Sequence, residues 1–372
     1  MTVRGIICLA FIIAGIRSCN GSKTQGPLLW QIDDVVETSH GVVNYKKSIE
    51  PYLSTANTAN RQPLLTIVEK DKTFAPDKHY YCNLSPYWWP DPKGGSAYIN
   101  IDGKINPEFY EFTDKQKFEE LSKNLKALSI AYFVTRDTSY LSTFTRQMHA
   151  WFIDTGTYMY PNIEYGQIAP GHYNNKGRSN AVIEAYCLND ILDGFRLLNS
   201  EKLIDDKTVS AFKEWLTLFL EWLVKSPQGK ESYNGNANTS VMYDVLVCNI
   251  AEFVGNKDVF DNITNSFGEH RIKTQIMETG EQPMELKRTR SFSYSVFNLV
   301  HILDFCYIQE SLGNHYYLQY EDYIDNAFQL LMSYIGREEE WPYQQITPIK
   351  QDENLLRQQY KRLVKLKELS GK

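Results

Sequence analysis

Most of this chain carries the periodicity of α-helices. From Asp114 onward, apolar side chains recur at intervals of three and four residues, beginning with Phe118, Leu121 and Leu125. This spacing places them on one face of a helix, whereas no alternation typical of a β-strand extends beyond a few residues. The pattern predicts helices over residues 118–132, 141–151, 182–198, 209–224, 241–253, 260–277, 292–312, 317–335 and 353–369.

The arrangement of these helices narrows the architecture further. Irregular loops join them, no repeat of fixed period is present, and no linker divides the chain. We therefore expect an all-α fold, a toroid of α/α hairpins that forms an incomplete barrel with long functional loops, rather than a solenoid. A single domain is predicted over residues 60–372, preceded by an N-terminal extension over 19–59.

Composition and charge exclude some classes of function. The chain has 372 residues, of which 42% are apolar, so it can bury a large core and is not disordered. Its formal charge of −6 argues against general nucleic-acid binding, which needs a broad basic face. A polyanionic substrate still fits if positive charge is concentrated locally. No CxxC spacing or His/Cys cluster indicates a metal, and no cofactor is expected.

The first 18 residues resemble a bacterial lipoprotein signal. Arg4 precedes an apolar run over residues 6–16, which is too short to cross a membrane as a mature helix. Cys19 follows and would become the lipidated first residue after cleavage. The alternative is an ordinary secretory signal with a coincidental cysteine. We expect export to the periplasm or outer membrane of a Gram-negative bacterium, with anchoring through Cys19.

A basic segment precedes the helix predicted over residues 292–312. Lys287, Arg288 and Arg290 place three cations within four residues, and Tyr294 follows at the start of the helical pattern. In an acidic protein this arrangement indicates an anion site with a phenol beside it. The alternative is a solvated basic turn before a helix whose tyrosine is half-buried.

Two loops hold the remaining candidates for substrate binding. Prolines bound a Tyr-Trp-Trp run, so these aromatic side chains either fill the core or line a groove that stacks on sugar rings. A polar, Gly-rich connector over residues 158–178 can reach hydroxyl and carboxylate groups. The candidates in these loops are Tyr87, Trp88, Trp89, Gln167, His172, Asn174, Asn175 and Arg178.

Several of these motifs resemble the alginate lyase superfamily of α/α-toroid polysaccharide lyases. The resemblance covers roughly residues 60–310, and its motifs occur in the family's order. They are YYCNLSPYWWPDP at 80–92, NPE at 106–108, YPN at 160–162, YGQ at 165–167, PG at 170–171, YD at 243–244 and ELKRTRSFSYSVFNL at 285–299.

One departure from the family pattern concerns a catalytic position. The family carries Asn-Asn-His a few residues before the Tyr-Asp pair, whereas this chain reads Ala237-Asn238-Thr239. Asn238 matches the amide that neutralises the substrate carboxylate, and Thr239 stands where the histidine is expected. A shift of one residue would give the amide role to Asn236 instead. Asp244, like Glu184, is expected to be structural.

The resemblance implies β-elimination at a 1,4-linked uronic acid. The developing enediolate needs neutral amides and cations around the carboxylate, which are the roles implied for Asn238, Arg290 and Arg288. Tyr294 would remove the C5 proton if nearby cations lower its pKa from about 10 toward neutrality. His172 is a candidate for a second acid/base group, or a loop histidine that only hydrogen-bonds. Lys287 would contact the substrate.

The missing histidine bears on specificity. One tyrosine serves both ends of the reaction when the C5 proton and the O4 leaving group lie on the same ring face, as in mannuronate. We therefore predict an acidic polysaccharide substrate, poly-mannuronate (alginate) first and glucuronan second. Two other classes stay open: an inverting glycoside hydrolase on the same fold, which needs paired carboxylates, and a non-catalytic glycan-binding lipoprotein.

Overall fold

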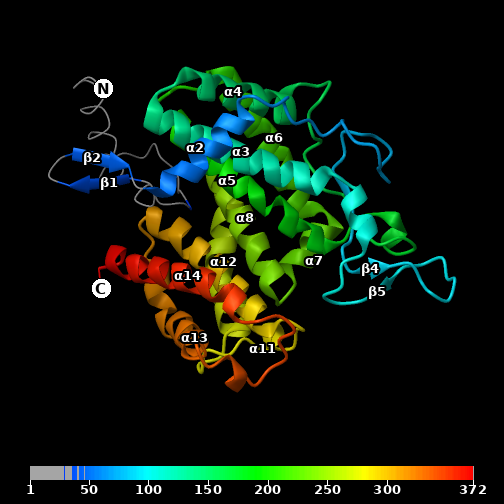
Figure 1. Ribbon diagram of the computed structural model, residues 1–372, viewed down its shortest axis with the longest axis vertical. Helices are drawn as coiled ribbons and strands as arrows, with labels where there is room; N and C mark the ends of the chain where they lie inside the picture. Colours follow the sequence, from blue (N-terminus) through cyan, green and yellow to red (C-terminus); the bar gives the residue numbers. More distant parts are fainter. Residues whose placement is uncertain (1–28, 30–35, 40–41, 46, 372) are drawn as a thin grey trace.

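The computed structural model describes residues 29, 36–39, 42–45 and 47–371 (Figure 1). The predicted signal and Cys19 lie outside these residues. The helices are α2 (Glu50–Ala59), α3 (Asp114–Thr135), α4 (Thr138–Met148), α5 (Leu188–Asn199), α6 (Asp206–Lys225), α7 (Pro227–Tyr233), α8 (Asn238–Val254), α9 (Lys257–Phe267), α10 (Lys273–Gln275), α11 (Pro283–Leu286), α12 (Ser291–Ser311), α13 (Glu321–Ser333) and α14 (Lys350–Leu369). The strands are β1 (Val36–Ser39), β2 (Val42–Tyr45), β3 (Cys82–Leu84), β4 (Trp88–Trp89), β5 (Ile99–Asn100) and β6 (Tyr165–Ile168).

Helices α8 and α12 form the centre of the molecule. They lie between α3 and α5 on one side and α13 and α14 on the other (Figure 1), and they pack against each other. Most side chains of both helices are buried, as expected for helices enclosed by others. One large apolar core extends from α2 to α14. The prediction of an all-α fold is therefore confirmed.

Four of the predicted helices are interrupted. Residues 141–151 end in a π-helical segment, His149–Ile153, after α4, and residues 317–335 begin as a 3₁₀ segment, Tyr316–Gln319, before α13. Residues 182–198 begin as a 3₁₀ segment, Ser179–Cys187, before α5. Residues 260–277 contain a π-helical turn, Gly268–Ile272, between α9 and α10. A side chain at position 268 would collide with the Tyr320 ring, since a Cβ there would lie 1.9 Å from its hydroxyl oxygen. The apolar periodicity was correct in all four cases but cannot report such local changes of helical pitch.

Helix α7 was not predicted, although its start signals are present. Ser226 caps it by accepting a hydrogen bond from the Gly229 N–H at 3.0 Å, and Pro227 occupies the first helical position. Its backbone packs closely on the preceding helix, because a Cβ on Gly229 would lie 1.7 Å from the Leu223 carbonyl oxygen. The helix ends at Tyr233, five residues before α8.

The pairing of strands β3 and β6 brings together the two loops that contain the candidate binding residues. Strands β3 and β6 pair in parallel, so the segments that follow them emerge at the same end. One segment continues into β4, which contains Trp88 and pairs with β5 in an antiparallel hairpin. The other leads into the Gly-rich connector. This pairing brings the Tyr-Trp-Trp loop and the connector together.

The helical domain begins before residue 60, which corrects the predicted boundary. Helix α2 packs on α3, and Ala56 and Ala59 lie in the main core. Tyr140 of α4 donates a hydrogen bond to the Asn57 carboxamide at 2.8 Å.

The cysteines Cys82, Cys187, Cys248 and Cys306 are free thiols. Within the described ranges, no helix is both long and apolar enough to cross a membrane.

Candidate active site

Tyr294 lies in the first turn of α12, with a cation over its ring. The ring is half-buried, and the guanidinium carbon of Arg288 lies 3.9 Å from the ring centroid. The side chain of Tyr87, from the Pro-bounded loop, lies close enough to Tyr294 to act on its pKa. The structure thus joins a phenol, a cation and a second phenol from segments about 200 residues apart.

The pKa of Tyr294 is raised rather than lowered. Burial is the main cause, and it outweighs Arg288, which acts in the opposite direction; the neighbouring Tyr87 raises the pKa further. The expectation that neighbouring cations lower this pKa toward neutrality is therefore wrong. A single guanidinium stacked on the ring does not compensate the phenolate for its lost hydration.

Arg288 is held in place by an aspartate that no motif indicated. Arg288 Nη2 donates to Asp102 Oδ1 at 3.2 Å, and Thr289 Oγ1 donates to Asp102 Oδ2 at 3.3 Å. Asp102 belongs to the loop that follows β5. This loop lies against the segment just before α12, as shown by Gly103, where an added Cβ would lie 3.2 Å from Thr289 Oγ1.

The other two cations of the basic segment are oriented differently. Arg290 Nε lies 3.3 Å from Thr347 Oγ1, and the Arg290 backbone forms a β-bridge with Gln345. Lys287 is exposed. Among the three predicted cations, Arg288 is the one that contacts the Tyr294 ring.

Asn238 is the first residue of α8 and is fixed by a buried carboxylate. Its backbone N–H and its Nδ2 donate to the two oxygens of Glu285, at 2.8 and 2.6 Å. Burial raises the pKa of Glu285, and the two bonds from Asn238 act in the opposite direction. The Arg288 N–H donates to the Glu285 carbonyl oxygen at 3.0 Å, which connects Asn238 to the Tyr294 cluster. Asn236 is exposed.

A second cluster forms where the two loops meet. His172 Nε2 donates to the Tyr98 carbonyl oxygen at 2.7 Å, and the His172 ring lies 4.5 Å from the Trp88 ring in an edge-on arrangement. The Arg178 guanidinium lies over Trp88 at 5.3 Å and donates to Ser85 Oγ at 3.1 Å. His172, Trp88 and Arg178 therefore lie together, and Trp88 directly follows Tyr87 in the chain.

The tip of this cluster has a strained backbone. Tyr173, Asn174 and Asn175 have φ values of 52°, 55° and 55°, in the left-handed region that non-glycine residues rarely adopt. All three side chains are exposed. Asn175 Oδ1 accepts a hydrogen bond from the Gly171 N–H at 2.9 Å. Backbone strain of this kind is typical of functional loops.

Gln167 does not reach this surface, which corrects its predicted role. The residue is 5% exposed, and its Nε2 donates to Glu184 Oε1 at 3.1 Å. Glu184 also accepts from the Tyr81 hydroxyl at 2.7 Å and from Asn83 Nδ2 at 3.0 Å. Gln167 is thus part of the buried network around Glu184, behind β3 and β6.

Trp89 separates from its neighbour Trp88. Its Nε1 donates to the Lys104 carbonyl oxygen at 2.9 Å, and Lys104 Nζ lies 4.9 Å from the ring centroid. The side chains alternate along β4, so Trp88 contacts His172 and Arg178 whereas Trp89 binds the β5 side of the hairpin.

In the part of the chain that the structure describes, no group of three or more His, Cys, Asp or Glu side chains could hold a metal ion.

Comparisons with known proteins identify the family. The sequence profile of the family described as alginate lyase matches residues 66–341. The chain belongs to the alginate lyase family. This confirms the resemblance of the motifs. A comparison with curated proteins gave no match.

Solved structures of the family share the α/α-toroid fold. An alginate lyase from Bacteroides ovatus is 32% identical, with a TM-score of 0.80, and the match covers 87% of this chain and 88% of that one. Alginate lyase A1-III from Sphingomonas species A1 is 14% identical, with a TM-score of 0.50 over 78% of each chain. A histidine variant of A1-III complexed with tetrasaccharide has a TM-score of 0.52 at 13% identity, over 78% of this chain and 77% of that one. The predicted toroid is therefore confirmed.

Proposed function

We propose that this protein is a polysaccharide lyase that cleaves alginate by β-elimination without a metal, with poly-mannuronate as the first substrate and glucuronan as the second. The observation that carries the proposal is the Tyr294 cluster, in which the phenol lies under the guanidinium of Arg288, near Tyr87. Membership in the alginate lyase family supports the same reaction class, as does the B. ovatus structure described as an alginate lyase.

The reaction moves one proton from C5 of the sugar to O4 of the leaving chain. Tyr294, as the phenolate, removes the C5 proton, and the resulting enediolate expels O4 as the C4–O4 bond breaks. The phenol then gives its proton to O4, and a C4=C5 double bond remains. Asn238 and Arg288 would stabilise the negative charge on the carboxylate, since preorganised donors act most strongly where charge develops.

A preference for mannuronate over guluronate would follow if Tyr294 alone acts as base and acid, because the C5 proton and O4 lie on the same ring face in mannuronate and on opposite faces in guluronate. Thr239 occupies the position of the family histidine and carries no titratable group near neutral pH. His172 Nε2 is committed to a backbone carbonyl and its ring to Trp88. This environment favours a role for His172 in shaping the loop rather than in proton transfer.

The test is the ultraviolet absorbance of the new double bond, measured with poly-mannuronate, poly-guluronate and glucuronan without added metal. We expect the fastest rise with poly-mannuronate. A faster rise with poly-guluronate would contradict the single-tyrosine specificity. Reducing ends without absorbance would mean hydrolysis instead of elimination.

A non-catalytic acidic-glycan binder is the second candidate. Two observations favour it: Thr239 replaces the family histidine, and burial raises the pKa of the candidate base. Binding of poly-mannuronate in affinity electrophoresis, with no absorbance change on any uronan, would identify this function.

Anchoring through Cys19 is also a proposal. Cells that express the full-length chain and are fed a labelled fatty acid should label the wild type but not Cys19→Ser. Equal labelling of both would exclude this lipidation site, and secretion of unlabelled wild-type protein would indicate an ordinary signal.

A further inference from the structure

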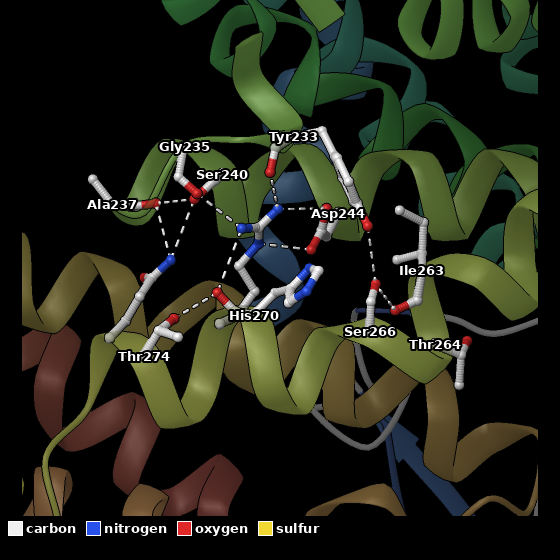
Figure 2. A network of polar contacts seen from close by, with 12 residues as sticks. Tyr233, Gly235, Ala237, Ser240, Asp244, Ile263, Thr264, Ser266, His270 and Thr274 are labelled. Carbon is white, nitrogen blue, oxygen red and sulfur yellow. Dashed lines mark hydrogen bonds and ion pairs between the residues drawn. The ribbon is translucent and has the colours of Figure 1, made fainter. Parts of the chain in front are cut away.

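A line of buried amide side chains begins at the first turn of α8. Ser240 Oγ donates to the Ala237 carbonyl oxygen at 2.6 Å, and Figure 2 shows both residues beside the amide group that contacts them. Gln275 Nε2 donates to Ser240 Oγ at 3.2 Å and lies 3.5 Å from the Ala237 carbonyl oxygen. The line therefore starts beneath Asn238 and Thr239.

The same line ends beside Tyr294 on α12. Asn298 Nδ2 donates to Gln275 Oε1 at 3.3 Å and to Gln282 Oε1 at 2.9 Å. Gln282 Nε2 donates in turn to the carbonyl oxygen of Ser295, the residue that follows Tyr294, at 3.1 Å. Asn298 lies one helical turn beyond Tyr294 and is fully buried.

The two ends of the line fix the orientation of every amide. A backbone carbonyl only accepts, so Gln275 and Gln282 must each direct their NH₂ group toward Ala237 and Ser295. Both glutamine oxygens then face Asn298, whose two N–H groups satisfy them. Asn298 Oδ1 is buried with no hydrogen-bond partner among the described residues. Asn298 thus keeps both donor bonds although its own acceptor is left unsatisfied, which carries a free-energy cost.

We propose that Asn298 is a positioning residue that sets the distance between Tyr294 and the Asn238–Thr239 end of α8. The inference rests on the proposed lyase function. The base, Tyr294, and the amide that would bind the carboxylate, Asn238, lie on different helices. A reaction of this type needs each group within a fraction of an ångström of its productive position. Asn298 joins the two helices beneath the site through Gln275 and Gln282.

The other contacts of this segment support the assignment. Buried Arg271 donates to the Gly235 and Tyr233 carbonyl oxygens at 2.9 and 2.6 Å and pairs with Asp244 at 2.7 Å. Figure 2 shows Tyr233, Gly235 and Asp244 around this guanidinium. Arg271 therefore fixes the segment before α8 to α8 itself and does not reach α12. Besides the connection through Glu285 and Arg288, a second, buried link from α8 to the helix of Tyr294 runs through Asn298.

The test compares Asn298→Ala with Asn249→Ala. Asn249 is equally buried on α8 and is also hydrogen-bonded, to Asn189 and Arg196, but lies three turns from Asn238. We expect Asn298→Ala to lower kcat on poly-mannuronate by at least about tenfold with KM within about threefold, because misplacement of the base acts on the transition state. Asn249→Ala should keep kcat within about twofold at a comparable loss of thermal stability. Equal losses of kcat in both variants would overturn the inference.

Asn298→Asp provides a second test, a pH-dependent change in kcat that a general loss of folding would not produce. A carboxylate at this position would face two glutamine oxygens, whereas its protonated form can donate to one of them. We expect the kcat deficit relative to wild type to shrink as pH falls. A deficit that does not change with pH would contradict the role.

A crystal structure of Asn298→Ala separates this inference from the proposed function. We expect Tyr294 to move relative to Asn238 by more than about 0.5 Å. Unchanged positions would overturn the positioning role whatever the activity. Absence of elimination by the wild type would instead overturn the lyase proposal, and the structural comparison would still decide the role of Asn298.

Discussion

The two halves of the candidate site are built in opposite ways. Asn238 and Tyr294 stand on core helices, and the buried carboxylate of Glu285 holds Asn238. The Trp88 and His172 half consists of loops with ring contacts and a strained, exposed tip at residues 173–175. The difference indicates a division of labour in which the rigid helices would hold the reacting groups and the loops would hold the chain of sugars.

The largest effect is expected from loss of the carboxylate that fixes Asn238. Glu285→Ala removes both bonds to Asn238, so kcat should fall by about a hundredfold, the scale of losing one donor to a developing oxyanion. Steady-state kinetics on poly-mannuronate would measure it, with Glu281→Ala as a surface control. A change in KM alone would mean that Asn238 binds the substrate without stabilising the transition state, which is the role assigned here to the loops.

The pH dependence of the rate tests the helix-borne half next. Because burial raises the pKa of Tyr294, the phenolate is scarce at neutral pH and its population grows with pH. We expect kcat/KM to increase by about tenfold per pH unit and to keep rising to about pH 10, the ordinary pKa of tyrosine. A plateau below about pH 8 would mean that another group, or a tyrosine of lowered pKa, is the base.

The loop-borne half should respond in KM. Trp88→Ala removes the ring that Arg178 and His172 pack against, and we expect KM to rise by about tenfold with kcat within about threefold. Trp89→Ala is the matched control, because this neighbouring tryptophan binds Lys104 instead. Equal changes in KM for the two substitutions would show that the different contacts of Trp88 and Trp89 do not determine substrate binding.

The smallest effect is expected at His172. His172→Gln keeps a donor for the Tyr98 carbonyl oxygen, so kcat should stay within about threefold of the wild type. Stopped assays on poly-mannuronate and poly-guluronate would measure it. A loss of a hundredfold or more would identify His172 as the second acid/base group and would transfer part of the chemistry to the loops.

The sequence predicted the helix-borne half better than the loop-borne half. Helical periodicity located α8 and α12, and the motif around residues 285–299 contained Arg288, Tyr294, Glu285 and Asn298. Three features depended on tertiary contacts and left no local pattern. They were the pKa of Tyr294, the burial of Gln167 against Glu184, and the contact of Asp102 with Arg288 across 186 positions. Local periodicity cannot report desolvation or pairing over such separations.

The most direct measurement is the initial rate of absorbance increase with poly-mannuronate for the wild type and Tyr294→Phe, with binding of the polymer measured for both. The account predicts that the wild type forms the double bond and that the variant loses more than about a hundredfold in kcat while it still binds. Loss of only the ring hydroxyl leaves the contact with Arg288 in place. A variant that eliminates at the wild-type rate would contradict the account, because Tyr294 would then be neither the base nor the acid.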